Sequence, residues 1–187
     1  MAGAHSRRKQ PELVRRALLD ETVKIASEHG VAAVTIDAVA KAAGVTKGGL
    51  FHHFPSKQAL IDGVLAEMME DFQEQLDALI AADPEPAGRF TRAYIEAVFA
   101  DLDKADSRPW AALAVSMITD PTTRAVWSNW FMDYIGRHRA DESSIELTLA
   151  RLAADGAWYA AVLGVEDRAG PRRDVLKARL IAMTRPA

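Results

Sequence analysis

Residues 45–60, VTKGGLFHHFPSKQAL, decide how this chain folds and raise the question of its function. The stretch holds two adjacent glycines, two adjacent histidines and two lysines. Glycines beside a lysine can cradle a phosphate group, and paired histidines can bind a metal ion or move protons. Both interpretations would make the chain an enzyme. The alternative is a surface shaped to lie against a charged partner.

The spacing of these residues does not fit either enzyme interpretation. Gly48 and Gly49 follow a short helix and a turn, whereas glycine motifs that bind nucleotides follow a strand, and neither motif pattern is present. His52 and His53 are adjacent, so on a helix they point about 100° apart and do not chelate one ion from one face. No cysteine or nucleophile motif accompanies them. We therefore expect no catalytic residue, no metal site and no cofactor.

The same stretch and its neighbours predict a helix-turn-helix. Two short helices, residues 36–43 and 47–54, are joined by AGVT, a tight turn that contains a glycine. Thr35, Thr46 and Ser56 each stand at a helix start, where a hydroxyl and free N–H groups bind phosphate well. Each glycine costs its helix about 1 kcal/mol relative to alanine, yet a bare helix face lets the backbone approach a groove. The alternative is that the glycines only relieve packing.

The rest of the chain has helical periodicity and no alternating segment between turns, so the expected fold class is all-α. Expected helices cover residues 11–29, 57–82, 89–104, 108–119, 121–139, 144–163 and 172–183. Ser143 with Glu146 predicts a capping box at one helix start. The helix over residues 57–82 spans roughly 35–40 Å, long enough to run from one module into another. We expect a helix-turn-helix domain over residues 1–57 and a second helical domain over residues 58–187.

Charge is distributed unevenly along the chain. Residues 1–57 hold nine Lys/Arg and five Asp/Glu, whereas the remaining residues hold 14 and 21, for a net charge of −3. A basic N-terminal part suits a polyanionic partner, although simple charge scatter is the alternative. The chain has no cysteine, no signal peptide and no apolar run long enough to span a membrane. We therefore expect a cytoplasmic protein without a membrane partner.

Residues 35–65, TIDAVAKAAGVTKGGLFHHFPSKQALIDGVL, resemble the DNA-binding domain of the tetracycline-repressor (TetR/AcrR) family of transcriptional regulators. The family pattern has a threonine that opens the second helix, A-x-x-A-G-V-[ST] through the turn, and then [LI]-[YF]-x-[HY]-F-x-[NS]-K-x-x-L. The resemblance implies a homodimeric regulator, expected to be a repressor, that binds a near-palindromic operator in double-stranded DNA and is released by a small-molecule effector. The alternative is a helical carrier or enzyme with an incidental helix-turn-helix. The effector, the operator, the target genes and the sign of regulation stay open.

The resemblance also implies roles for single residues of the helix-turn-helix. Phosphates of the DNA backbone would be contacted by Thr35, His53 and Lys57, with Thr46 capping the recognition helix. Base edges in the major groove would face Lys47, Gly48, Gly49 and His52. Phe51 departs from the tyrosine that is common in the family, and therefore lacks a hydroxyl for a phosphate. Leu50 and Phe54 would be structural.

Two further sets of residues lie in the part of the chain after the helix-turn-helix. Aromatic and methionine side chains at helical spacing could line an apolar effector pocket: Met68, Phe72, Phe99, Trp110, Met117, Trp127, Trp130, Phe131 and Tyr134. Small residues on the penultimate helix would let a partner helix approach closely: Ala153, Gly156, Ala157, Ala160 and Ala161. The resemblance implies that the last two helices form a four-helix dimer interface. Ordinary packing within one subunit is the alternative for both sets.

Overall fold

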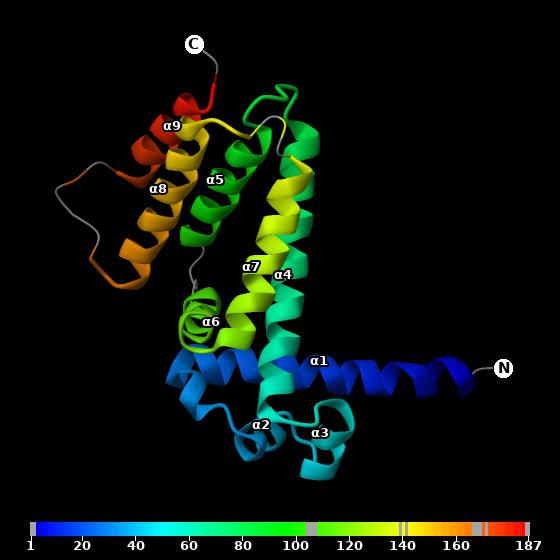
Figure 1. Ribbon diagram of the computed structural model, residues 1–187. Helices are drawn as coiled ribbons and strands as arrows, with labels where there is room; N and C mark the ends of the chain where they lie inside the picture. The colour runs from blue at the N-terminus through cyan, green and yellow to red at the C-terminus, as the bar shows by residue number, and fades with distance from the viewer. Residues whose placement is uncertain are drawn as a thin grey trace. The chain divides into compact units, whose positions relative to one another are not determined.

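The computed structural model describes residues 3–103, 108–138, 140, 142–165, 170 and 172–185, and of residues 3–10, 108, 113, 115 and 116 it describes the backbone alone. All regular structure in these residues is helical, as Figure 1 shows, which confirms the all-α prediction. The elements are α1 (Gly3–His29), η1 (Val31–Ala33), α2 (Ile36–Ala42), α3 (Lys47–His53), α4 (Lys57–Ala82), α5 (Arg89–Leu102), α6 (Arg108–Thr119), α7 (Pro121–Arg137), α8 (Ile145–Val162) and α9 (Arg173–Met183).

Most helix boundaries agree with the periodicity of the sequence, and the exceptions have local causes. Helix α1 begins at Gly3, ahead of the expected start at Pro11, because the alanine, arginines, lysine and glutamine before the proline favour a helix. The predicted capping box at Ser143 is wrong. The neighbouring Ser144 caps α8 instead, and its Oγ accepts a hydrogen bond from the Leu147 N–H at 3.2 Å. The expected helix ends at residues 104 and 139 lie outside the described residues.

The first of two compact units contains Met1–Met69 and Arg108–Thr123, so helix α6 belongs to it together with α1, α2, α3 and the first part of α4. Its core is made of aliphatic side chains and one aromatic ring that are almost completely buried: Leu18, Leu19, Val34, Val39, Leu50, Phe54, Leu60, Val64 and Leu65. These residues come from α4 and from α1, α2 and α3 with their connections, which together are called the three-helix head below. Helix α3 is therefore held by the same core as the start of the long helix α4.

The second unit contains Glu70–Ser107 and Arg124–Ala187, and α5 packs in it against α8 and α9. Its core consists of buried apolar side chains of α4, α5, α7, α8 and α9, and they include Leu76, Phe90, Ile95, Phe99, Tyr134, Ala150, Ala154 and Leu180. Both units share helices α4 and α7, whose residues divide between them. The expected boundary between two domains after residue 57 remains a prediction. The two compact units are divided differently, because α6 and the start of α4 belong to the same unit as α1, α2 and α3.

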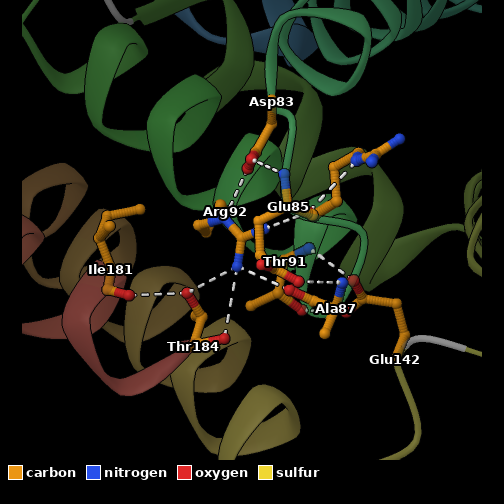
Figure 2. A network of polar contacts seen from close by, with 9 residues as sticks. Asp83, Glu85, Ala87, Thr91, Arg92, Glu142, Ile181 and Thr184 are labelled. Carbon is orange, nitrogen blue, oxygen red and sulfur yellow. Dashed lines mark hydrogen bonds and ion pairs between the residues drawn. The ribbon is translucent and has the colours of Figure 1, made fainter. Parts of the chain in front are cut away.

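One buried arginine joins the linker after α4 to the end of α9, as Figure 2 shows. The Arg92 side chain donates to Asp83 Oδ2 at 2.5 Å, to Glu85 O at 2.6 Å and to Ala87 O at 2.8 Å. It also reaches Thr184 O at 3.4 Å. Since Arg92 is only 4% exposed, these partners replace the water that its charge loses on folding.

Gly88 lies beside this arginine and cannot be replaced without strain. Its φ is +73°, and a Cβ built on it would lie 2.7 Å from the carbonyl oxygen of Thr184. A second buried charge pair contacts Thr91, the residue before Arg92: Arg151 Nη1 donates to Glu142 Oε2 at 3.1 Å and to Thr91 Oγ1 at 2.5 Å. The two networks fix the start of α5 against the residues around α8 and α9.

Candidate nucleic-acid interface

Two threonines begin the helices of the helix-turn-helix. Thr35 Oγ1 accepts a hydrogen bond from the Ala38 N–H, and Thr46 Oγ1 accepts one from the Gly49 N–H, both at 3.1 Å. These caps confirm the predicted helix starts. Between the helices, Gly44 has a φ of +67°, which a side chain would strain, so the turn needs its glycine.

The inner face of α3 is fixed by apolar burial. Leu50 is completely buried and Phe54 is 4% exposed, as expected for the two residues predicted to be structural. The guanidinium of Arg15 lies 5.2 Å from the centre of the Phe54 ring, so α1 covers that ring from outside with a cation–π contact. The buried face thereby determines which side chains of α3 point outward.

The outward face carries most of the residues that were predicted to bind DNA. Exposed residues of this set are Thr35, Thr46, Lys47, Gly48, Phe51 and His52. The partly buried ones are Gly49, His53 and Lys57. On α3, the exposed members recur at four-residue steps, so they form one face of the helix. Phe51 is 49% exposed, a large apolar area for a short surface helix.

The two glycines of α3 differ in what surrounds them. A Cβ at Gly48 would meet only Thr46 Oγ1, at 3.9 Å, so packing within the chain does not require a glycine there. A Cβ at Gly49 would lie 3.3 Å from the same oxygen, which is tight. The packing alternative therefore applies to Gly49 and not to Gly48.

Two lysines of the predicted interface already have partners inside the chain. Lys57 Nζ donates to Val31 O at 2.8 Å and to Ala32 O at 3.4 Å, so at most one of its three N–H groups remains for a phosphate. Lys47 Nζ lies 2.6 Å from Asp37 Oδ1, and both side chains are about two-thirds exposed, at 64% and 67%. Sequence reasoning missed both contacts. The signal for the second was Asp37, the single acidic residue between residues 30 and 61.

The expected effector pocket divides between the two units. Phe72, Phe99, Trp127, Trp130, Phe131 and Tyr134 belong to the second unit, and Met68, Trp110 and Met117 belong to the first. Phe99 and Tyr134 are core residues, 1% and 2% exposed. The other rings expected in the pocket, Phe72, Trp127, Trp130 and Phe131, are partly buried. The Phe72 ring centre lies 6.1 Å from that of Trp130 and 6.4 Å from that of Trp127.

Polar side chains that the sequence did not single out contact these aromatic rings. Trp130 Nε1 donates to Gln73 Oε1 at 3.0 Å, and the Tyr134 hydroxyl donates to Asp77. The Tyr94 hydroxyl donates to Asp155 Oδ1 at 2.5 Å. Burial raises the pKa of the Asp155 carboxyl above its usual value, although the hydrogen bond from Tyr94 opposes that shift. The second unit therefore contains an aromatic cluster with carboxylates beside it.

Helix α8 exposes an apolar stripe that runs along its full length. The stripe consists of residues at alternating four- and three-residue steps: Ile145, Leu149, Leu152, Gly156, Tyr159 and Leu163. The exposed fraction is 64% at Ile145, 60% at Leu152 and 70% at Leu163, which directly follows the helix. Of the small residues predicted to face a partner, Ala153 and Gly156 are exposed, and Ala157, Ala160 and Ala161 are partly buried. On α9, Val175 is 55% exposed. The period of the stripe was present in the sequence and could have identified it.

The described residues contain neither a metal-binding cluster nor a helix that could span a membrane. No group of three or more histidine or acidic side chains there is placed to hold a metal ion. Likewise, none of the helices in that part of the chain combines the length and the apolarity that crossing a bilayer needs.

Family models match two parts of the chain. Residues 18–64 match the model of bacterial regulatory proteins of the tetR family, and residues 88–185 match the model of the tetracyclin repressor-like C-terminal domain. Together the two matches cover α1 from residue 18 onward, α2, α3, the start of α4, and α5 to α9. The matched families are regulators of transcription rather than enzymes.

Similar proteins of known name are also regulators. The chain is 31% identical over 101 residues to the HTH-type transcriptional repressor KstR2 of Rhodococcus jostii, a match that covers 54% of this chain and 47% of that protein. It is 26% identical to the HTH-type transcriptional regulator BetI of Escherichia coli, over 80% of this chain and 82% of BetI.

The fold is shared with solved structures. A TetR-family transcriptional regulator from Streptomyces coelicolor superposes with a TM-score of 0.70 at 21% identity, over 98% of this chain and 93% of that one. The multidrug binding protein EbrR, in complex with malachite green, superposes with a TM-score of 0.72 at 18% identity, over 92% of this chain and 98% of that one.

Proposed function

Because the chain belongs to the TetR family of DNA-binding transcriptional regulators, we propose that it acts as a homodimeric repressor whose DNA binding is relieved by a small molecule. The observation that carries the proposal is the exposed face of α3. Lys47, Gly48 and His52 lie on this face, whereas Leu50 of the same helix is completely buried. The similarity to a protein named as a repressor supports the sign of regulation.

The DNA contacts follow from the chemistry of that face. Lys47 and His52 would read base edges in the major groove, since an ammonium donates to guanine acceptors and an imidazole can donate or accept. Gly48 would let the helix backbone come close to the groove, and packing within the chain does not account for this glycine, because a Cβ there would meet only Thr46 Oγ1, at 3.9 Å. Thr35, Thr46 and His53 would contact phosphates, and Lys57 would have at most one N–H to offer.

Dimerisation would use the apolar stripe of α8 together with α9. A row of exposed leucine, isoleucine and tyrosine side chains costs free energy in water and is typical of a surface that a partner covers. Gly156 lies within the row, and a Cβ there would meet nothing in the same subunit, so a partner helix could approach closely. A two-fold dimer would place two recognition helices in successive major grooves of a near-palindromic operator.

The effector would bind at the aromatic cluster of the second unit, around Phe72, Trp127 and Trp130. A ligand that prefers a conformation of this unit unsuited to operator binding would weaken DNA binding, and DNA would weaken ligand binding equally. Helix α4 would transmit the change, because its residues contribute to both units.

Selection of duplexes from a random-sequence DNA pool tests the proposal. We expect a near-palindromic sequence to be enriched. Lys47→Ala and His52→Ala should each weaken binding to it by about 1–3 kcal/mol, and should weaken binding to a scrambled duplex far less. Lys24→Ala, which removes an exposed lysine of α1, is the matched control. Equal losses on both duplexes would contradict the roles given to Lys47 and His52, and no binding to any duplex would contradict the proposed function.

A further inference from the structure

We propose that Asp37 determines how the chain distinguishes its operator from other DNA, by keeping Lys47 available to base edges while withholding it from phosphates. The inference rests on the proposed function, because it assumes that α3 enters the major groove. It goes further by giving a role to an acidic residue at a surface that has to approach a polyanion.

The position of Asp37 is unusual for its charge. It lies in the first turn of α2, and it is the only acidic residue among residues 30–61, which also contain three lysines and two histidines. An exposed carboxylate at a DNA-binding surface repels phosphates and lowers affinity for any duplex. A favourable interaction with the dipole of α2 explains an acid at this position in general, yet it does not explain why the carboxylate is ion-paired to the first residue of α3.

The carboxylate of Asp37 forms an exposed ion pair with a lysine of the next helix. Lys47 Nζ lies 2.6 Å from Asp37 Oδ1, although the two residues belong to different helices. Both side chains are exposed, so the pair contributes little to the stability of the fold. Its effect is on what else the ammonium can bind.

Phosphates and bases make different demands on this ammonium. If Lys47 leaves Asp37 to contact a phosphate, a carboxylate without its partner remains near the polyanion, so the exchange gains little. A phosphate contact draws its free energy from the net positive charge of the ammonium, which Asp37 neutralises. A guanine needs only N–H donors, and Lys47 can keep one of its three N–H groups on Asp37 while it donates the other two to the two guanine acceptors. The pair therefore disfavours contacts that carry no sequence information and is compatible with contacts that do.

The test compares binding to a 30-base-pair duplex of random sequence over a range of salt concentrations. Without the carboxylate, Lys47 should behave as an additional phosphate contact. Asp37→Asn should then raise affinity for this duplex roughly two- to five-fold. It should also steepen the dependence of log K on log salt by about 0.9 for each subunit that contacts the DNA.

Two controls separate this mechanism from a simple loss of negative charge. Asp62→Asn removes an exposed carboxylate of the same unit whose described partner is the neutral side chain of Gln58, and it should leave the salt slope unchanged. In a double-mutant cycle, Asp37→Asn should no longer steepen the slope once Lys47 is alanine. Asp37→Ser, which keeps a side chain suited to a helix start, should reproduce the effect of the asparagine variant if that variant folds poorly.

The outcomes distinguish the inference from the function on which it rests. An unchanged slope in Asp37→Asn, or the same increase with and without Lys47, would overturn the inference while the wild type still binds DNA. Failure of the wild type to bind any duplex at low salt would overturn both. With the selected operator, the ratio of operator to random-duplex affinity should fall in Asp37→Asn, and an unchanged ratio would also overturn the inference.

Discussion

Gly63, in the middle of the first part of α4, lies directly against the ring of Phe54 at the end of the recognition helix. A Cβ at Gly63 would be 2.9 Å from Phe54 Cε1 and 3.0 Å from Leu19 Cδ2. Both neighbours are buried, at 4% and 1% exposed, so a shift of either side chain disturbs the close packing of the core. The absence of a side chain at this position is what lets the long helix support α3 closely.

This contact predicts that Gly63→Ala destabilises the protein although alanine is the better helix former. Overpacking should cost about 1–3 kcal/mol of unfolding free energy, which exceeds the gain of about 1 kcal/mol in helix propensity. Denaturant unfolding measures the difference. Gly48→Ala is the control, because it has the same propensity gain in open space and should be at least as stable as the wild type. Equal stability of the two variants would show that Phe54 and Leu19 rearrange freely.

Gly48→Ala provides a second prediction, on DNA. A methyl group on the exposed face of α3 should hold the backbone away from the groove and weaken operator binding by about 1 kcal/mol or more, while the fold is retained. Fluorescence anisotropy with the selected operator measures the loss. Wild-type affinity in this variant would mean that the α3 backbone does not approach the DNA at Gly48.

Phe51→Tyr should strengthen DNA binding. The ring is 49% exposed, so a hydroxyl can be added without strain and can donate to a phosphate. One such hydrogen bond is worth about 0.5–1.5 kcal/mol, and the gain should be similar on operator and random duplexes because a phosphate carries no sequence. Phe51→Leu, which adds no hydroxyl, should show no gain. A tyrosine variant that binds no better than the wild type would place the ring away from the backbone.

Leu149→Glu combined with Leu152→Glu should convert a dimer into monomers. Both leucines lie on the α8 stripe, 50% and 60% exposed, and two buried carboxylates facing a partner would cost several kcal/mol of association. Sedimentation equilibrium at micromolar concentration measures the mass. Leu13→Glu changes a leucine of α1 that is 66% exposed, and should leave the mass at twice that of the chain. A monomeric wild type would exclude the proposed interface.

The Asp83–Arg92 pair predicts how stability depends on pH. Burial alone would raise the pKa of Asp83. The hydrogen bonds from Arg92 and from the Glu85 N–H, together with the positive charges of Arg92 and Arg89, outweigh burial and lower the pKa below its usual value of 3.8. The folded state therefore binds this proton less tightly than the unfolded state does. The stability that the carboxylate contributes is present above pH 3.8 and is lost as pH falls through the lower folded value.

Asp83→Asn should remove that contribution. The variant should be less stable than the wild type by about 1–3 kcal/mol at pH 7, because Arg92 loses its charged partner, and the difference should shrink below pH 3.8. Thermal or denaturant unfolding across the acid range measures it. Asp174→Asn breaks the exposed ion pair between Asp174 and Arg172, and should change the stability of the protein little at any pH. A constant difference across the range would show that Asp83 does not act through its charge.

The sequence by itself determined the helical class and the helix-turn-helix, including the caps at Thr35 and Thr46 and the turn at Gly44. Those features depend on hydrogen bonds and backbone angles within a few residues, so the local pattern contains them. The boundaries of α4 and α6 followed from periodicity for the same reason. The apolar stripe of α8 is also a local pattern. The prediction of a dimer interface nevertheless used the small residues of this helix and not the large apolar residues of the stripe.

Only the tertiary structure decided which charges are already paired. Lys47 reaches Asp37 on another helix, Lys57 reaches the carbonyls of η1, and Arg92 joins the linker after α4 to Thr184. It also placed α6 in the unit of the head and buried Phe99 and Tyr134 in the core. These contacts depend on how the helices cross each other, and the spacing of residues along one helix does not predict that crossing. For that reason the sequence was enough to identify the lysines of the predicted interface, but only the fold showed which partners each lysine already has.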